Sequence, residues 1–219
     1  MKIKDRDMRP VLFDYLDLRY GKIRTYEELY IGDTRADILA VIPGMLLGFE
    51  IKSDADTYTR LETQVKDYDK YCDLNYVVIG ESHAKHISEH IPEHWGIMLV
   101  AHTEGENGCG TVTELREAKP NRKVKLNNKL KLLWRRELSD LLKRNSLPKY
   151  AQKSKKFVSE TLLERVEETL LAEQICDVLF ERDYTIFEDD PNARKKPKKH
   201  SSAKTRQRRA ARRILKGGK

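Results

Sequence analysis

Two short apolar segments separated by a turn signal dominate the hydrophobic pattern. Residues 35–42 and 45–53 are each apolar enough for a β-strand, and Pro43-Gly44 between them is typical of a turn. Proline fixes a negative φ, so a tight primed turn is disfavoured and we expect a slightly longer loop. The pattern predicts a β-hairpin.

A symmetric closure of this hairpin places acidic side chains opposite each other. Counting outward from the turn puts Asp37 opposite Glu50, and the alternation of side chains puts Lys52 on the same face as Glu50. Gly48 also lies on this face, and we expect its missing side chain to leave room for a phosphate. Facing carboxylates repel, and a bound cation beside Lys52 would compensate. Hard oxygen ligands of this kind suit Mg²⁺ or Mn²⁺; an exposed strand face with an ordinary ion pair is the alternative.

The rest of the chain reads as alternating helices and strands, which indicates an α/β fold. A buried strand over 75–80 is expected to run parallel to its neighbour across a helical crossover, and 111–117 is expected to form an edge strand. The other predicted segments are helices over 7–20, 54–71, 83–91, 126–145 and 159–182, a strand over 95–101, and an acidic connection over 22–34.

The hairpin resembles the signature of the PD-(D/E)XK nuclease superfamily, the restriction-endonuclease-like fold. That signature is an Asp at the start of one strand followed by Glu/Asp-x-Lys on the next, here Asp37 and Glu50-Ile51-Lys52. Ala36 replaces the usual proline and touches no ligand. The surrounding segments YEELYIGDTRADI, GFEIKSDADTYTRLETQVKDY and IPEHWGIMLV look like a little-characterised bacterial and phage branch related to DNA-repair members. The resemblance covers roughly residues 5–145.

The resemblance implies roles for further residues. An upstream acid that adds a metal contact corresponds to Glu28, with Glu27 as its rival, and the motif points the Ile51 carbonyl toward the metal. A Gln-x-x-x-Tyr pair on the following helix corresponds to Gln64 and Tyr68, which would border the metal pocket and contact the substrate phosphate. The alternative is that Tyr68 belongs to the core and Gln64 is a boundary amide.

The resemblance also implies an architecture and an activity. We expect a restriction-endonuclease-like core with a mixed central sheet flanked by helices over 1–120, a C-terminal helical subdomain over 121–190 and a disordered basic tail over 191–219. The implied activity is Mg²⁺- or Mn²⁺-dependent hydrolysis of DNA phosphodiester bonds in repair, recombination or phage DNA processing. The alternative is a catalytically silent nucleic-acid-binding or adaptor protein on the same fold. Endonuclease and exonuclease action are not distinguished.

Composition and charge restrict the classes further. No run of about 18 apolar residues and no secretory signal is present, and three dispersed cysteines favour a reduced, cytoplasmic setting. The net charge is +8, but residues 192–219 contain 13 Lys/Arg and no acid, so the remainder carries 8 − 13 = −5. Such a tail is expected to bind DNA phosphates, with a solvated solubility tail as the alternative.

The C-terminal helices are expected to serve packing or self-association. The acidity of the helix over 159–182 argues against a helix-turn-helix that enters a DNA groove. A homodimer or a partner in a repair or phage complex fits this expectation. Four histidines between 83 and 94 recur at zinc-site spacing, but Pro92 interrupts them and no carboxylate or thiol completes a set, so zinc is disfavoured.

Overall fold

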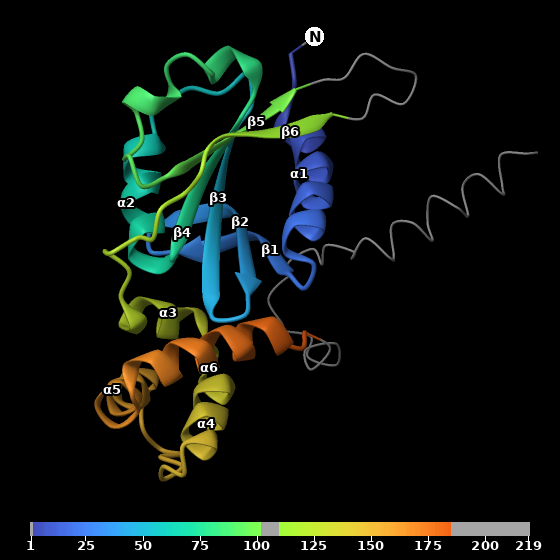
Figure 1. Ribbon diagram of the computed structural model, residues 1–219. Helices are drawn as coiled ribbons and strands as arrows, with labels where there is room; N and C mark the ends of the chain where they lie inside the picture. Colours follow the sequence, from blue (N-terminus) through green and yellow to red (C-terminus); the bar gives the residue numbers. More distant parts are fainter. Residues whose placement is uncertain (1, 102–109, 185–219) are drawn as a thin grey trace, which may run out of the picture.

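A six-stranded mixed sheet in the order β1-β2-β3-β4-β5-β6 forms the centre of the molecule (Figure 1). The structure is a computed structural model that describes residues 2–101 and 110–184. The pairs β1–β2, β2–β3 and β5–β6 are antiparallel, whereas β3–β4 and β4–β5 are parallel. The strands are β1 (Arg24–Ile31), β2 (Thr34–Ile42), β3 (Met45–Lys52), β4 (Leu74–Ile79), β5 (Gly96–Ala101) and β6 (Thr111–Arg116).

Helices cover both faces of this sheet, which confirms the predicted α/β class and the C-terminal helical layer (Figure 1). One face carries α1, and the other carries α2 with the later helices packed at the β2–β3 hairpin end. The helices are α1 (Asp5–Tyr20), α2 (Leu61–Tyr71), α3 (Leu126–Leu132), α4 (Arg135–Arg144), α5 (Lys155–Arg165) and α6 (Glu168–Glu181), and two 3₁₀ turns occupy Glu81–His83 and Ile87–Glu89.

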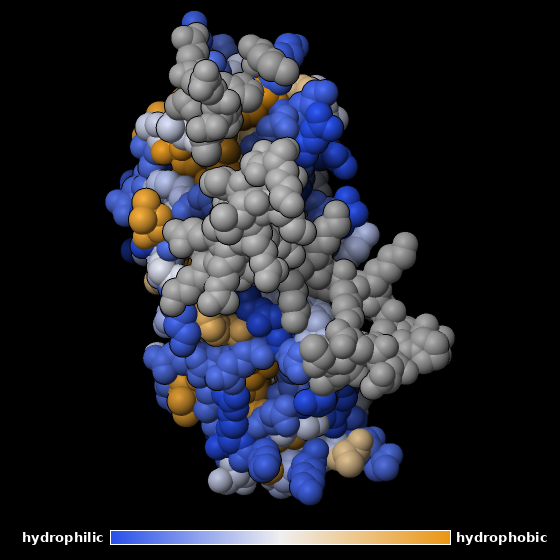
Figure 2. All heavy atoms as spheres, turned by 90° about the vertical axis from the view of Figure 1, so that its right-hand side faces the viewer, coloured by the Kyte–Doolittle hydropathy of each residue, from blue (hydrophilic) through white to orange (hydrophobic). Residues whose placement is uncertain are grey.

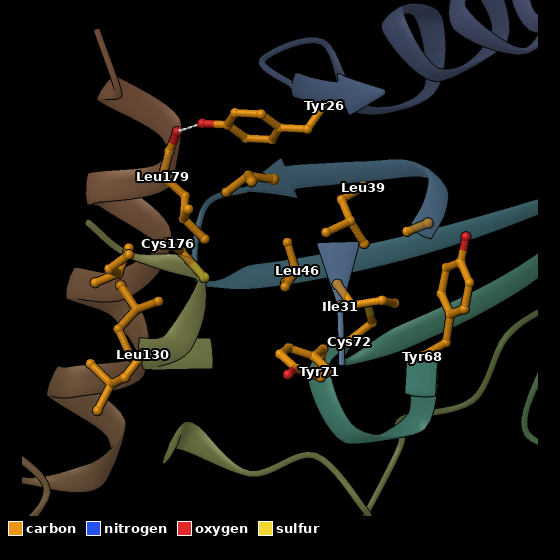
Figure 3. Packing of buried hydrophobic residues seen from close by; sticks show 14 of the residues in the cluster. Tyr26, Ile31, Leu39, Leu46, Tyr68, Tyr71, Cys72, Leu130, Cys176 and Leu179 are labelled. Carbon is orange, nitrogen blue, oxygen red and sulfur yellow. Dashed lines mark hydrogen bonds between the residues drawn. The ribbon is translucent and has the colours of Figure 1, made fainter. Parts of the chain in front are cut away.

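The C-terminal helices share one hydrophobic cluster with the sheet. Leu130 of α3 and Cys176 of α6 pack with Leu39 and Leu46 of the hairpin (Figure 3). The Tyr26 hydroxyl also donates to the carbonyl of Leu179 in α6. The core therefore continues across the boundary near residue 120 at which we predicted two domains, and that division stays a prediction.

Two long helices predicted from the apolar period are each broken in two. The region 126–145 divides into α3 and α4, and 159–182 divides into α5 and α6. At the first break the Glu137 carboxylate accepts the N–H of Trp134, and at the second the Glu167 carboxylate accepts the N–H groups of Thr169 and Leu170. A carboxylate near a helix N-terminus satisfies unpaired N–H groups and the helix dipole. Each glutamate thus starts a new helix without interrupting the apolar pattern.

Three further predictions need correction. The segment predicted as a helix over 83–91 contains two 3₁₀ turns instead, Glu81–His83 and Ile87–Glu89. The connection predicted over 22–34 contains strand β1, whose acidic residues hid its alternation at the edge of the sheet. The helix predicted over 54–71 begins only at Leu61, because Asp54 binds the N–H groups of Ile3 and Ser82 instead of capping a helix.

The hairpin closes on two residues, so the longer loop we expected is absent. Ile42 pairs with Met45, and Gly44 has a φ of 75°. Proline followed by a positive-φ glycine is the pattern of a type II turn. The predicted symmetric closure of the hairpin is confirmed.

The basic tail and Cys109 lie outside the described residues. The other two cysteines, Cys72 and Cys176, are buried free thiols. Among the helices of residues 2–101 and 110–184, none has the length and apolarity needed to cross a membrane. The face shown in Figure 2 is mainly hydrophilic where it is not covered by grey atoms.

Candidate functional site

Three acidic residues lie at the same level of three neighbouring strands. The β2–β3 pairing ends at Ile38↔Phe49, so the next positions outward are Asp37 and Glu50. On the other side of β2, the pairs Glu27↔Ile38 and Leu29↔Ala36 place Glu28 at the level of Asp37. The predicted opposition of Asp37 and Glu50 is therefore present.

At this level a tyrosine from α2 interrupts the backbone hydrogen bonding between β2 and β3. The hydroxyl of the fully buried Tyr68 accepts the N–H of Asp37 at 3.0 Å and donates to the carbonyl of Phe49 at 3.0 Å. The Asp37 carboxylate then reaches across to accept the N–H of Ile51 at 2.8 Å. Tyr68 and Ile51 together fix where the Asp37 carboxylate stands.

Glu50, Lys52 and Gln64 form a closed hydrogen-bonded cluster beside it. The Lys52 Nζ donates to Glu50 Oε1 at 2.8 Å and to Gln64 Oε1 at 3.0 Å, and the Gln64 amide also donates to Glu50 Oε1. The side chains of Glu50 and Lys52 are 1% and 6% exposed. The second carboxylate oxygen, Glu50 Oε2, is buried and accepts no hydrogen bond from any residue that the structure describes. A buried anionic oxygen without a donor is costly, and a cation would satisfy it.

Burial raises the pKa of both facing carboxyls. For Asp37 the pKa rises to about 7, through desolvation and then repulsion by Glu50, against the opposing effects of the Ile51 N–H and Arg9. The pKa of Glu50 is also raised by desolvation, opposed chiefly by Lys52. Neighbouring acids with raised pKa values are common at functional sites, because function requires the charges to be close.

A guanidinium from α1 holds the upstream acids. Arg9 donates to Glu28 Oε1 at 2.7 Å, to Glu27 Oε2 at 3.3 Å and to the Asp37 carbonyl at 3.2 Å, and it lies 3.7 Å from Asp37 Oδ1. Arg35 binds the other oxygen of Glu28 at 2.7 Å. Both oxygens of Glu28 are thus engaged by arginines.

The backbone at Glu28 is strained. Its φ is 58°, the left-handed region that non-glycine residues rarely adopt. Such strain costs on the order of 1 to 3 kcal/mol and clusters at functional sites. The strain turns Glu28 out of the regular β1 geometry at the point where it faces Asp37.

Replacing Glu28 should reveal this strain. We expect Glu28→Gly to unfold at higher urea than Glu28→Ala, with a difference of about 1 kcal/mol, because glycine accepts a positive φ freely. Both variants lose the same carboxylate, so their difference isolates the backbone. In an unstrained strand alanine would be the more stable of the two, and that order would contradict the assignment.

The side chains at this site supply part of the ligand set that a small divalent cation needs. Asp37 and Glu50 supply two facing carboxylates, and the unpartnered Glu50 oxygen offers a ligand position. In the part of the chain that the structure describes, no three carboxylate, imidazole or thiol groups gather as a metal site. Glu28 thus stands at the correct level of the sheet but is held by Arg9 and Arg35.

Most residues predicted for the site lie together, and one expectation is corrected. The cluster unites Asp37, Glu50, Lys52, Gln64 and Tyr68. Gly48 does not leave room for a phosphate, since a Cβ there would lie 2.4 Å from the Tyr68 ring. Arg9 was not predicted as a site residue, because its only signal in the sequence is Asp5 one helical turn before it.

The fold and this cluster define an α/β protein with a facing acid pair, a lysine and a glutamine on a mixed sheet. A family model described as bacteriophage P4 protein cII matches residues 4–201. The chain therefore belongs to the bacteriophage P4 protein cII family, which links it to phage. Searches of curated proteins and of solved structures gave no significant match.

Proposed function

We propose that this protein is a metal-dependent nuclease that hydrolyses DNA phosphodiester bonds in phage DNA processing, repair or recombination. The observation that carries the proposal is the facing pair of the half-buried Asp37 and the buried Glu50 beside Lys52, with one Glu50 oxygen that accepts no hydrogen bond from the described residues. Neighbouring buried carboxylates destabilise the metal-free protein, and a bound cation offsets their repulsion.

The residues would divide the chemistry among them. Asp37 and Glu50, with the Ile51 carbonyl, would hold Mg²⁺ or Mn²⁺, and Glu28 could join them after release from Arg9. A metal of this kind lowers the pKa of its bound water and neutralises phosphate charge. Lys52 is held by Glu50 and Gln64 and would stabilise the negative charge that develops on the phosphoryl oxygens, or orient the attacking water.

Tyr68 takes a positioning role in this proposal. Its hydroxyl is bound to the backbone of both strands and its ring is fully buried, so it sets the spacing of Asp37 from β3. Gln64 is half-buried and hydrogen-bonds to both Glu50 and Lys52. From this position it would border the metal pocket and contact the substrate phosphate.

A second candidate, a catalytically silent DNA-binding or adaptor protein, is favoured by one observation. Arg9 already supplies a positive charge between Glu28 and Asp37. A guanidinium in this place could neutralise the acids permanently and leave the fold as a binding platform.

Cleavage by the purified full chain separates the two candidates. We expect Mg²⁺ or Mn²⁺ to support hydrolysis of at least one substrate in a set of end-labelled linear, nicked, flapped, junction and single-stranded DNAs, and EDTA to stop it. The products also distinguish endonuclease from exonuclease action. DNA binding without hydrolysis of any of these substrates at either metal would favour the silent candidate.

A further inference from the structure

Positive charge in the folded part is concentrated in one segment of the helical layer. Residues 119–156 contain 14 Lys/Arg and two acids, a net charge of +12, whereas residues 157–184 contain two Lys/Arg and eight acids, a net charge of −6. Charges that serve only solubility would be mixed in sign along the surface. This segregation indicates a surface with an anionic partner.

Hydrogen bonds bring the cations of three helices together. The Nζ of Lys155, in the first turn of α5, donates to the carbonyl of Lys131 in α3 at 2.8 Å. Arg135, at the start of α4, donates to the carbonyl of Tyr150 at 2.8 Å and reaches the Lys153 carbonyl at 3.5 Å. We call this area the basic-aromatic surface, and it comprises Lys131, Arg135, Tyr150, Lys153, Lys155 and Phe157.

Two aromatic rings lie among these cations. Tyr150 and Phe157 meet edge to face with centroids 5.2 Å apart, and the Lys153 Nζ lies 5.2 Å from the Phe157 centroid. Phe157 is 37% exposed, and Tyr150 is held at a φ of 47°. A bulky residue in that conformation needs support from its surroundings, which Arg135 supplies through the Tyr150 carbonyl.

The cations of this surface lack acidic partners within the described residues. Lys131, Arg135, Lys153 and Lys155 make no ion pair there, although their neighbours Lys129, Lys156 and Arg182 each pair with a carboxylate. Burial and repulsion by Arg182 lower the pKa of Lys155, as expected for a cation in a positive environment. A polyanion would supply the missing charge.

We propose that the basic-aromatic surface binds the phosphate backbone of a nucleic acid at a place separate from the acid pair. Unpaired lysines beside the exposed ring of Phe157 and the half-buried ring of Tyr150 suit a strand whose phosphates meet the cations and whose sugars or bases meet the Phe157 ring. An acidic protein partner fits less well, because protein interfaces require a larger apolar centre than Phe157 offers.

The surface lies at the opposite end of β3 from Lys52. Lys129 of α3 binds Asp73, which in turn bonds to Leu46 at the start of β3, whereas Lys52 ends that strand six residues later. Six residues of strand span about 20 Å. The surface therefore holds nucleic acid at a distance from the proposed reaction centre. The choice of nucleic acid rests on the proposed function, so binding is tested without cleavage.

The test measures DNA affinity against salt concentration for the full chain in EDTA. The probe is a fluorescently labelled random-sequence duplex followed by anisotropy. We compare the wild type, Lys131→Gln/Lys153→Gln/Lys155→Gln, and the control Lys2→Gln/Lys4→Gln/Lys85→Gln, which removes the same charge from exposed lysines in the N-terminal segment and the first 3₁₀ turn region. Circular dichroism and urea unfolding confirm that both variants are folded.

The first variant should bind at least about tenfold more weakly at low salt, and its salt slope should flatten by about 0.9 for each phosphate that it no longer neutralises. The control should keep a slope close to that of the wild type. Equal salt slopes for the Lys131/Lys153/Lys155 variant and the control would contradict the proposal that the basic-aromatic surface binds DNA. Equal weakening toward polyglutamate and DNA would overturn the assignment to nucleic acid and indicate an acidic protein. Cleavage at saturating DNA by the first variant tests the proposed nuclease separately, since its acid pair is untouched.

Discussion

Asp37→Asn should abolish metal-dependent DNA cleavage and at the same time stabilise the metal-free protein. The amide keeps an oxygen that can accept the Ile51 N–H, but it removes one of the two facing charges. A carboxyl whose pKa rises from 3.8 to about 7 costs up to about 4 kcal/mol of stability above pH 7. Urea unfolding at pH 8 in EDTA measures the gain, and calorimetry with Mg²⁺ or Mn²⁺ measures the loss of divalent binding.

The pH dependence of stability gives this prediction a definite sign. Folded Asp37 retains its proton to about pH 7, whereas the unfolded chain loses it near pH 3.8. Between these values the folded state binds more protons, so the stability contribution of Asp37 falls as pH rises. Asp37→Asn should remove this part of the decline, and the two proteins should be closest in stability near pH 4.

Divalent binding should follow the same ionisation in the wild type. Because the ligand carboxyl must be deprotonated, metal affinity should increase from pH 6 to pH 8, across the Asp37 pKa of about 7, and level off at higher pH. Unchanged divalent binding in Asp37→Asn would place the metal elsewhere. A variant less stable than the wild type at pH 8 would show that the Asp37 charge is compensated in the metal-free protein, for which Arg9 is the nearest candidate.

The sequence predicts the centre of the site because strand geometry is local. Once Pro43-Gly44 is a turn, the alternation of side chains determines that Asp37 faces Glu50 and that Lys52 shares its face. The helix period similarly places Gln64 and Tyr68 one turn apart. The loop length was predicted wrongly, but the register survived, because a symmetric two-residue turn preserves the same pairing.

The features of the site and of the fold that the sequence did not predict depend mainly on contacts between residues distant in sequence. Arg9 reaches the acids only because α1 packs across the sheet, and the positive φ of Glu28 has no signal in the sequence. Gly48 was interpreted as space for a phosphate, but the Tyr68 ring occupies that space. The glutamates that begin α4 and α6 act through caps, which an apolar period does not reveal.

The pairing of Glu50 with Lys52 makes single substitutions in this pair difficult to interpret. Lys52→Met leaves the buried Glu50 without its cation, and Glu50→Gln leaves the buried Lys52 without its anion. Removing one partner of a buried pair typically costs about 3 to 5 kcal/mol, whereas replacing both can be nearly neutral. A loss of cleavage in either single variant could therefore reflect unfolding instead of chemistry.

Lys52→Met, Glu50→Gln and the double variant should separate these effects. We expect both single variants to be less stable than the wild type and the double variant to regain much of the loss in urea unfolding. Cleavage should fall at least about 10²-fold in Lys52→Met, because the charge that stabilises the developing oxyanion is gone. Divalent binding should persist in that variant, since Asp37 and Glu50 remain, and it should be lost with Glu50→Gln. The double variant should stay inactive despite its restored stability. Wild-type cleavage by folded Lys52→Met would remove Lys52 from the chemistry. Cleavage that returned with stability in the double variant would show that the pair serves only the fold.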